Sequence, residues 1–412
     1  MSENTYPSVN DLTLEEKASL TSGGDAWHLQ GVEAKGIPGY MITDGPHGLR
    51  KSNSATTGEV DLNNSVPATC FPPAAGLSSS WNPELIHQVG EAMAEECIQE
   101  KVAVILGPGV NIKRNPLGGR CFEYWSEDPY LAGHEAVGIV AGVQSKGVGT
   151  SLKHFAANSQ ETDRLRISAN ISQRALREIY FPAFEHIVKE AQPWTIMCAY
   201  NCINGVHAAQ DRWLLTDVLR DEWGFQGIVM SDWGADHDRV ASLNAGLNLE
   251  MPPSYTDDQI VYAARDGRIQ PAQLDRMAQG MIDLVSKTRA AMSVENYRFD
   301  IEAHDEVAHQ AAVESMVLLK NDDAILPVAG DAKVAVIGEF ARTPRYQGGG
   351  SSHITPTKMT SFLDALAERG VDAKFAVQDG LVKVNGQTET QRGKKLVSGD
   401  KVEYDGETIV IE

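Results

Sequence analysis

The sequence predicts an α/β protein: a (β/α)₈-type barrel, followed by an incomplete α/β sandwich domain and a small β-rich tail. Three observations support this prediction. Short apolar runs alternate with helical patterns over the first 292 residues, polar residues end at least five of the runs, and closely spaced alternating strands begin near residue 376. Strands that alternate with helices indicate parallel pairing with right-handed crossovers, which a barrel satisfies.

The expected barrel elements follow from the spacing of apolar residues. An amphipathic helix is expected first, over residues 12–21, and a Gly-rich loop follows it. Short apolar runs predict the strands 40–43, 102–106, 148–152, 194–199, 227–231 and 246–250. Apolar residues at helical spacing predict the helices 83–100, 128–146, 172–191, 211–223, 235–244 and 271–292. An open doubly wound sheet is the competing architecture, but no GxGxxG follows the first strand, which favours the barrel.

The domain boundaries follow from changes in this pattern. We expect the barrel over residues 1–292, a linker over 293–302, the start of an α/β sandwich domain over 303–375 and a β-rich fragment over 376–412. The sandwich domain is expected to be truncated, because a doubly wound domain needs more strands than it offers. Its expected elements are helix 303–319, strand 333–338, helix 358–369 and strand 372–375.

Composition excludes several classes of function. The formal net charge of −20 argues against nucleic acid or an anionic membrane as the main partner of the whole chain. No apolar run of 18 residues is present, and the polar, acidic N-terminus is not typical of a secretory signal. The five cysteines are odd in number and include no CxxC, which argues against a disulfide framework or a zinc site. We therefore expect a cytoplasmic protein with no membrane partner, metal or cofactor.

The stretch FQGIVMSDWGA, residues 225–235, contains the most informative strand end. An apolar run stops at Ser231-Asp232, and Trp233 follows. In a (β/α)₈ barrel the chemistry lies at the carboxyl ends of strands, so Asp232 is a candidate nucleophile. The alternative is that Asp232 caps the next helix, because Asp often follows a strand for that reason.

Two further polar clusters follow expected strands. Asp44 and Arg50 lie in TDGPHGLR, where Arg50 could orient Asp44, although Asp-Gly-Pro could also be a simple turn. Arg120 follows two glycines, which suggests a guanidinium directed into a pocket where the backbone must stay slim. A surface ion pair with Glu123 is the alternative for Arg120.

Lys153 and His154 are adjacent at another strand end, which is easier to explain if both reach into a polar cleft. Met197 and Tyr200 end a further strand and could form the wall of that cleft, although core packing also explains them. Carboxylates, cations and aromatic rings on one rim suit a sugar. The sequence contains no HxH, HExxH or P-loop pattern that would indicate a metal or a phosphate instead.

Five motifs together resemble glycoside hydrolase family 3, the β-glucosidase family. TDGPHGLR, RNPLGGRCFEYWSEDP, KHFAANSQETDR, MCAYNCING and GIVMSDWGA occur in the family's order, and the resemblance covers about residues 8–375. It implies hydrolysis of terminal non-reducing β-D-glucosides with retention, through a covalent glycosyl-enzyme intermediate. The third motif lacks the KHFPGHG pattern of the N-acetylglucosaminidase branch, so a small β-glucoside or oligosaccharide is the expected substrate.

The resemblance also implies roles for single residues. Asp232 corresponds to the nucleophile, and Asp44 to the residue that binds the outer hydroxyls of the first sugar. Arg164 matches a further family arginine, for which direct contact is less expected. The other substrate-binding residues implied are hydrogen-bond donors and the wall of the sugar subsite: Arg50, Arg120, Lys153, His154, Met197, Tyr200 and Trp233.

The acid/base residue is the main departure from the family pattern. In this branch a Glu from the second domain protonates the leaving group, and the family pattern in this chain stops near Phe375. Glu389 and Glu403 lie in a context that does not match the acid/base segment. We assign no acid/base residue and expect impaired hydrolysis.

The tail has a resemblance of its own. DGLVKVNGQTETQRGKKLVSGDKVEYDG is similar to the C-terminal half of an S4-like RNA-binding module. This implies RNA as a partner through residues 376–412, with weak binding because the whole chain is acidic. The alternative to an active enzyme is therefore a catalytically weak sugar-binding or RNA-associated fusion protein.

Overall fold

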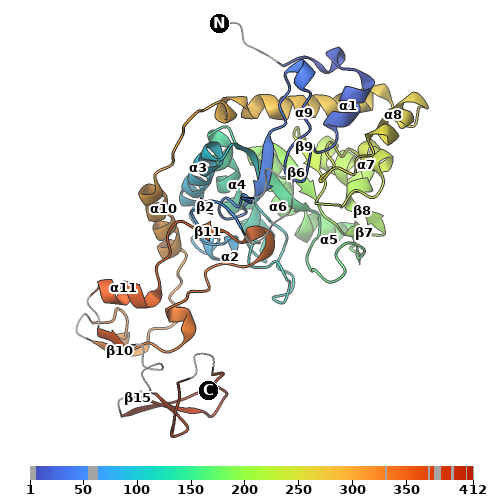
Figure 1. Cartoon of the computed structure of the whole chain (residues 1–412). Coiled ribbons are helices and arrows are strands. Elements are labelled where there is room, and N and C mark those ends of the chain that lie inside the picture. The colour runs from blue at the N-terminus through green and yellow to red at the C-terminus, as the bar shows by residue number, and fades with distance from the viewer. Residues whose placement is uncertain are drawn as a thin grey trace. The chain divides into compact units, whose positions relative to one another are not determined.

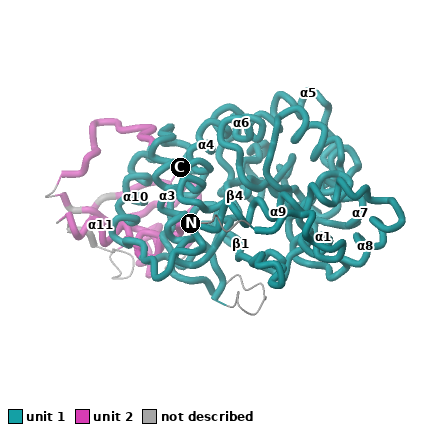
Figure 2. The backbone as a smooth tube through the Cα atoms, turned by 90° about the horizontal axis from the view of Figure 1, so that it is seen from above, with its two compact units in different colours: residues 1–316, 347–357 teal, residues 317–346, 358–412 magenta. Residues whose placement is uncertain are grey.

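A computed structural model of the chain describes residues 6–53, 64–329, 332–369, 372–374, 382–390, 394–404 and 406–411 (Figure 1). Two compact units are present: residues 1–316 with 347–357, and residues 317–346 with 358–412 (Figure 2). The first unit includes helix α10 (Ile301–Glu314), which the sequence led us to group with the second domain. All the candidate site residues lie in this first unit.

The first unit is organised around a five-stranded parallel sheet, which is the expected barrel-type arrangement of strands and crossover helices. Every residue in these strands is buried, as is typical of parallel sheets covered by helices on both faces. The strands confirm five of the expected ones with small shifts of their ends. In sheet order they are β1 (Met41–Asp44), β3 (Val102–Leu106), β4 (Gly149–Phe155), β6 (Thr195–Cys198) and β9 (Ile228–Met230).

The sixth expected strand, over residues 246–250, is wrong. Asn248 Oδ1 accepts a hydrogen bond from the backbone N of Val229 at 2.9 Å. A side chain therefore occupies the place where a neighbouring strand would offer its carbonyl group. Two isolated parallel bridges remain, between Met230 and Leu249 and between Ser22 and Glu250, and they continue the sheet without a regular ladder.

The main helices of the first unit surround this sheet and begin at recognisable caps (Figure 1). Asn82 and Asp128 each accept a hydrogen bond from a backbone N of the first helical turn, and proline follows each of them. The expected helix over 172–191 is divided by a π-helical turn, and a short helix near residue 260 was not expected. These helices are α3 (Pro83–Gln99), α4 (Pro129–Ser145), η4 (Leu176–Tyr180), α6 (Pro182–Ala191), η6 (Trp213–Glu222), α7 (Arg239–Ala245), α8 (Asp257–Arg265) and α9 (Pro271–Met292).

Shorter elements complete the first unit. A three-stranded sheet, β5-β7-β8, and the parallel pair β2-β11 lie outside the main sheet. Among the described residues, we find no helix with the length and apolarity that crossing a membrane requires. The short elements are η1 (Val9–Asp11), α1 (Leu14–Leu20), η2 (Glu33–Lys35), β2 (Pro67–Ala68), α2 (Ala74–Leu77), β5 (Ser168–Ala169), α5 (Gln173–Ala175), β7 (Cys202–Ile203), β8 (Val206–His207), η5 (Ala208–Gln210), η9 (Gly350–Ser352) and β11 (Thr355–Pro356).

The second unit contains two small sheets. One is the parallel pair of β10 (Lys333–Ala335) and β12 (Asp372–Lys374), next to which α11 (Phe362–Glu368) lies in the sequence. The other is antiparallel and confirms the expected β-rich tail, with a core of Val382, Val384 and Val402. Its strands, in sheet order, are β14 (Gln387–Thr388), β13 (Lys383–Val384), β15 (Lys401–Tyr404) and β16 (Glu407–Val410). The remaining elements are η7 (Asp322–Ala324) and η8 (Glu339–Ala341).

Candidate active site

A cavity of about 590 Å³ lies where strands of the main sheet end. Asp44 is the last residue of β1, and Asp232 follows β9 by two residues. Eight of the nine site residues expected from the sequence line this cavity, and Arg164 lines it as well. Its lining residues are Trp27, Asp44, Gly119, Arg120, Phe122, Glu123, Lys153, His154, Glu161, Arg164, Met197, Tyr200, Asp232, Trp233, Gly349, Gly350 and Ser351.

Asp232 presents one held and one free carboxylate oxygen. Oδ1 accepts a hydrogen bond from the backbone N of Trp233 at 2.7 Å. Oδ2 is buried and has no hydrogen-bond partner among the residues that the structure describes. The alternative role as a helix cap does not apply, because Asp238 caps α7 by accepting from the backbone N of Val240 and Ala241. Asp232 lines the cavity, and its Oδ2 is therefore available to a bound molecule.

His154 lies beside that free oxygen, with Nε2 at 3.6 Å from Asp232 Oδ2. Tyr124 Oη accepts from Asn158 Nδ2 at 3.0 Å and lies 3.0 Å from His154 Nδ1, so its own proton is available to Nδ1. This arrangement assigns the ring proton of a neutral His154 to Nε2, on the side of Asp232. Burial, aided by the charge of Arg120, holds the pKa of His154 well below its ordinary value, so the ring stays neutral.

Asp44 is held from behind by Arg50. Arg50 Nη1 lies 3.2 Å from Asp44 Oδ2, and the guanidinium is fully buried. Arg50 does not line the cavity, so its contact is with Asp44 rather than with the open space. Burial raises the pKa of Asp44 to about 6, although the positive charges of Lys153 and Arg50 oppose this rise.

Glu123 lies between two cations. Its Oε1 accepts from Arg120 Nε, and its Oε2 lies 4.0 Å from Lys153 Nζ. Burial alone would raise the pKa of Glu123, but the charges of Arg120 and Lys153 hold it below its ordinary value. The ion pair of Arg120 with Glu123 is thus part of the cavity wall. It is not the surface ion pair that the sequence left open as an alternative.

Aromatic rings form another side of the cavity. The rings of Trp27 and Trp233 lie 5.5 Å apart between centroids, and Trp233 Nε1 donates to the backbone O of Ala26. Tyr200 Oη donates to the backbone O of Trp233 at 3.1 Å. Arg164 stacks over the Tyr200 ring at 4.6 Å, which explains how it reaches the cavity.

Several lining residues were missed in the sequence. Trp27 lies in a loop well before β1 in the sequence, where neither its spacing nor its neighbours gave a signal, although in the fold its backbone O accepts a hydrogen bond from the backbone N of Ile42 in β1. The glycine loop at 348–350 did give one, because three consecutive glycines indicate a close approach. A Cβ at Gly348 would lie 2.3 Å from Phe122, so this loop can lie against Phe122 only without side chains.

The side chains of the cavity do not suit a metal ion. Within the described ranges, no group of three or more His, Cys, Asp or Glu side chains is arranged to hold a metal ion. The cations of the cavity are Arg120, Lys153 and Arg164, all supplied by the chain itself. Its chemistry is that of carboxylates, cations and aromatic rings.

Comparison with known proteins gives the family. Residues 49–284 match the model described as the N-terminal domain of glycosyl hydrolase family 3. The chain belongs to glycoside hydrolase family 3. Residues 362–412 match the S4 domain, so this likeness begins at α11, earlier than the boundary at residue 376 that the sequence suggested.

Relatives in this family include glycosidases with different stated substrates. An exo-α-(1→6)-L-arabinopyranosidase of Bifidobacterium breve is 86% identical over 385 residues, which is 91% of this chain and 51% of the relative. Thermostable β-glucosidase B of Acetivibrio thermocellus is 52% identical over 366 residues, or 88% and 48% of the two chains. The crystal structure of a family 3 β-glucosidase from Bifidobacterium adolescentis is 88% identical, with a TM-score of 0.86 over 90% of this chain and 53% of that one.

The extent of these matches is uneven. The chain spans about half the length of the curated relatives it matches. The chain has the same barrel-type fold as the solved β-glucosidase, which confirms the fold class expected from the sequence.

Proposed function

We propose that this protein is a retaining glycosidase that binds the terminal sugar of a β-D-glucoside, with Asp232 as its nucleophile. The observation that supports this best is the free, buried Oδ2 of Asp232 in a cavity with cations and aromatic rings. In the first step Oδ2 attacks the anomeric carbon, and the bond to the leaving oxygen breaks. Water then attacks the same carbon and releases Asp232.

The other residues of the cavity have binding roles in this proposal. Asp44 accepts hydrogen bonds from sugar hydroxyls, and Arg50 positions it. Arg120, Lys153 and His154 donate to the sugar; His154 does so through Nε2, which also faces the nucleophile. The rings of Trp27 and Trp233 offer flat surfaces for the C–H face of the sugar, and the remaining wall residues are Met197, Tyr200 and Arg164.

Protonation of the leaving group is the weak step of the proposed reaction. The other carboxylates that line the cavity are Asp44, Glu123 and Glu161. Each is paired with a cation: Asp44 with Arg50, Glu123 with Arg120 and Lys153, and Glu161 with Arg164 at 2.8 Å. The charges of Arg120 and Lys153 hold the pKa of Glu123 below its ordinary value, and Arg50 holds Asp44 as a binding residue, so we assign none of the three as the general acid.

An α-L-arabinopyranoside is the second candidate substrate, favoured by the 86% identity to the arabinopyranosidase. This sugar places its leaving group on the same ring face as a β-D-glucoside. It differs at the fourth hydroxyl and lacks the hydroxymethyl group. The two candidates therefore need the same nucleophile and differ only in contacts with the outer part of the ring.

Covalent trapping tests the nucleophile. A 2-deoxy-2-fluoro-β-D-glucoside with a dinitrophenolate leaving group should label the chain once, and mass spectrometry of peptides should locate the label on Asp232. Asp232→Asn should remain unlabelled. Asp238→Asn is the matched control, because Asn preserves the cap of α7, and it should be labelled like the parent. Labelling of another residue would contradict the assignment of the nucleophile.

Substrate choice is tested with two aryl glycosides that share one leaving group. Release of nitrophenolate from p-nitrophenyl β-D-glucopyranoside and from p-nitrophenyl α-L-arabinopyranoside should be compared as kcat/KM. A higher value for the glucoside is expected. A higher kcat/KM for the arabinopyranoside would make that sugar the proposed substrate, and the proposed nucleophile would stay the same.

A further inference from the structure

A buried arginine outside the cavity joins segments that form two of its sides. Arg239 is the first residue of α7, is 5% exposed and does not line the cavity. Its Nη1 donates to the backbone O of Thr21, and its Nη2 donates to Thr21 Oγ1 and to Asp257 Oδ1, each at 3.2 Å. Nε lies 3.2 Å from Glu250 Oε2, and Nη1 lies 3.8 Å from Asp236 Oδ2. One side chain thus holds a segment near the N-terminus to residues far along the chain.

Residues on either side of Glu250 hold the strand end that carries Asp232. The backbone N of Ser231 donates to the backbone O of Leu249 at 2.9 Å. Ser231 Oγ accepts a hydrogen bond from the backbone N of Met251 at 2.8 Å. Because Ser231 directly precedes Asp232, a displacement of the segment around Glu250 would also displace the proposed nucleophile.

Glu250 also holds the loop that carries Trp27. The backbone N of Glu250 donates to the backbone O of Thr21, and the backbone O of Glu250 accepts from the backbone N of Gly23, both at 3.0 Å. Trp27 lies farther along this loop and lines the cavity. Since the guanidinium of Arg239 contacts both Thr21 and Glu250, it fastens the Trp27 loop to the segment beside the nucleophile.

Three carboxylates surround the guanidinium of Arg239. Among the residues that the structure describes, no other Lys or Arg forms an ion pair with Asp236, Glu250 or Asp257. Burial raises the pKa of Asp236 and of Asp257, and the charge of Arg239 opposes the rise in each. Without this cation the carboxylates would repel one another, which would separate the segments that carry them. A guanidinium presents several donors in a fixed plane, so a Lys ammonium, a point charge, cannot make all of these contacts.

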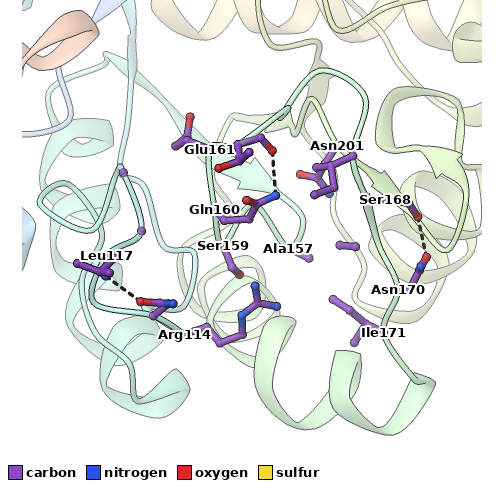
Figure 3. A pocket seen from close by; sticks show the side chains of 16 residues that line it. Arg114, Leu117, Ala157, Ser159, Gln160, Glu161, Ser168, Asn170, Ile171 and Asn201 are labelled. Carbon is purple, nitrogen blue, oxygen red and sulfur yellow. Dashed lines mark hydrogen bonds between the residues drawn. The ribbon is translucent and has the colours of Figure 1, made fainter.

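The side of the cavity formed by Tyr200 is held in another way. Asn201, which follows Tyr200, lines a second cavity of about 550 Å³ (Figure 3). Its Nδ2 donates to the backbone O of Ala156 at 3.2 Å and to the backbone O of Cys202 at 3.1 Å. These hydrogen bonds are uncharged and do not involve Arg239, so this side of the cavity should stay in place when Arg239 is changed.

We propose that Arg239 is a positioning residue that sets the place of Asp232 relative to Trp27 without touching the substrate. Its loss leaves Asp44 and Lys153 where they are, because neither contacts Arg239, but displaces the nucleophile and the aromatic wall. The rate of attack at the anomeric carbon depends steeply on the placement of Asp232, so this rate falls more than the affinity for the sugar does. The inference rests on the proposed function for the identity of the nucleophile.

The kinetics of labelling by the 2-deoxy-2-fluoro glucoside separate rate from affinity. Arg239→Lys should lower the maximal labelling rate constant about 10- to 100-fold, the cost of a displacement of about 1 Å, and should change the half-saturating concentration by less than about threefold. Arg220→Lys is the matched control. Arg220 donates to the backbone O of Gly227 and of Gly246, at the end of β9 away from Asp232, so this variant should be labelled like the unmodified chain.

Chemical rescue distinguishes the planar group from its charge. In Arg239→Ala, guanidinium chloride at concentrations well below those that unfold the chain should restore part of the labelling rate. Ammonium chloride at the same ionic strength should restore less, because ammonium is a point charge that cannot bridge the same acceptors. A role of Arg239 in folding alone would not give this difference between the two salts in the labelling of folded protein.

Fluorine NMR gives a signal that does not depend on labelling. With fluorotryptophan incorporated, the resonances of Trp27 and Trp233, assigned with Trp27→Phe and Trp233→Phe, should move in Arg239→Lys and stay in place in Arg220→Lys. An unchanged labelling rate in Arg239→Lys, or unmoved resonances in that variant, would overturn the inference. Resonances that move in Arg239→Lys while the unmodified chain is not labelled would contradict Asp232 as the nucleophile and support the positioning role of Arg239.

Discussion

At the scale of single residues, the cavity is defined by how its charges are paired. Lys153 is fully buried, and burial lowers its pKa, while the charge of Glu123 raises it. The ammonium group of Lys153 stabilises the ionised forms of both Glu123 and Asp44, because its charge opposes the rise in pKa that burial causes in each carboxyl. Among the lining residues that the structure describes, Glu123 Oε2 and Asp232 Oδ2 are both buried without a hydrogen bond, but Glu123 Oε2 lies 4.0 Å from the Lys153 ammonium, whereas Asp232 has no Lys or Arg partner of this kind. Pairing thus separates the binding carboxylates from the reactive one.

The raised pKa of Asp44 predicts how sugar binding depends on pH. Ionised Asp44 accepts hydrogen bonds from hydroxyls, and protonation near its pKa of about 6 removes that capacity. Glucose affinity, measured by calorimetry on the Asp232→Asn variant, should fall as the pH is lowered from 7.5 to 5. The decrease approaches roughly tenfold per pH unit below the pKa.

Substitution at Asp44 tests the origin of that dependence. Asp44→Asn should bind glucose more weakly at pH 7.5, and its affinity should then change little down to pH 5. Asp257→Asn is the control, because burial also raises the pKa of Asp257 but that residue lies outside the cavity. A glucose affinity that is constant between pH 7.5 and pH 5 before substitution would argue against ionised Asp44 as the acceptor.

The sequence predicted the residues of the cavity that follow strands. Asp44, His154 and Asp232 come at or just after strand ends, where barrel geometry brings them together. Trp27 and Glu161 come from loops, and a loop's path depends on tertiary contacts that no local pattern records. Arg50 contacts Asp44 but does not line the cavity, and its position in the sequence cannot show whether it reaches the cavity or only Asp44.

At the scale of elements, helix α10 is attached to α3 by a buried imidazole. His304 Nδ1 lies 2.9 Å from Glu96 Oε1, and Nε2 lies 3.2 Å from Glu95 Oε2. The ring of Phe299 stacks on His304 at 4.8 Å. Burial alone would lower the pKa of His304, but its hydrogen bond with Glu96 and the charge of Glu96 raise it overall.

This arrangement predicts a pH-dependent stability. A raised pKa in the folded state stabilises the fold fully below the unfolded pKa of about 6.5, and the contribution disappears as the pH rises through the folded value. His304→Gln should therefore lower the free energy of unfolding by about 1–3 kcal/mol at pH 6 and by less at pH 9. Urea unfolding at the two pH values measures this.

The matched control for His304 is on the same helix. His309 is exposed, with its nearest carboxylate, that of Glu306, 4.0 Å away, so His309→Gln should leave the unfolding free energy unchanged at both pH values. If His304→Gln lowers the free energy of unfolding equally at pH 6 and pH 9, packing and not the charged pair attaches α10 to α3.

The crossing of α3 and α4 depends on glycine. A Cβ at Gly142 in α4 would lie 2.1 Å from the backbone O of His87 in α3, so the helices approach too closely for any side chain there. Although Ala is favoured over Gly within a helix, Gly142→Ala should lower the free energy of unfolding by about 1–3 kcal/mol. Gly76→Ala in α2 is the control, since no atom lies within 4 Å of its added Cβ. Thermal unfolding of both variants provides the comparison, and equal midpoints would contradict the close crossing.

The elements themselves were predicted with uneven success for physical reasons. Strand 102–106 and helix 271–292 match the structure, since each is long or apolar enough for its pattern to dominate. The expected strand at 246–250 failed because the Asn248 side chain replaces a backbone acceptor, which an apolar pattern cannot reveal. Helix α8 was missed because its nine residues are too few for a helical pattern of apolar side chains to stand out.

At the scale of the whole molecule, an acidic chain carries a segment that matches the S4 domain. Residues 362–412 contain seven basic and ten acidic side chains, so this segment is itself acidic. Lys394 also pairs with Glu389 at 3.3 Å, which leaves less positive charge for phosphates. Binding to RNA depends mainly on basic side chains that replace counterions, so only weak binding is expected.

An RNA gel shift on the intact chain tests this expectation. With an RNA hairpin, half-saturation should require more than about 1 µM protein at roughly 0.15 M salt, the range of non-specific binding. Residual binding at low salt should weaken when Lys394 and Lys395 are both changed to Glu. The same change at Lys189 and Lys287, exposed lysines of the first unit, is the charge-matched control. Nanomolar binding at physiological salt would make RNA a main partner and refute the electrostatic argument.

The chain as a whole is also expected to discriminate between leaving groups. Among the carboxylates lining the cavity, all but Asp232 are paired with Lys or Arg, so under the proposed function we expect the leaving oxygen to depart without a well-placed acid. General acid assistance is typically worth about 10²–10⁴-fold, and a dinitrophenolate needs little of it. The ratio of kcat/KM for 2,4-dinitrophenyl β-D-glucoside to that for cellobiose should therefore exceed the ratio measured for thermostable β-glucosidase B of Acetivibrio thermocellus by about 10²–10⁴-fold.

Azide provides an independent check on this argument. It attacks the glycosyl-enzyme without help from a general base, whereas water requires that help, so azide should accelerate turnover of the dinitrophenyl glucoside and yield the β-glucosyl azide. Turnover of cellobiose should not respond, because its slow step precedes the intermediate. Asp232→Asn should be inactive with both substrates. Similar kcat/KM values for the two substrates and no effect of azide would mean that a carboxyl group of this chain supplies the proton, and Asp44, with its pKa of about 6, would be the first to substitute.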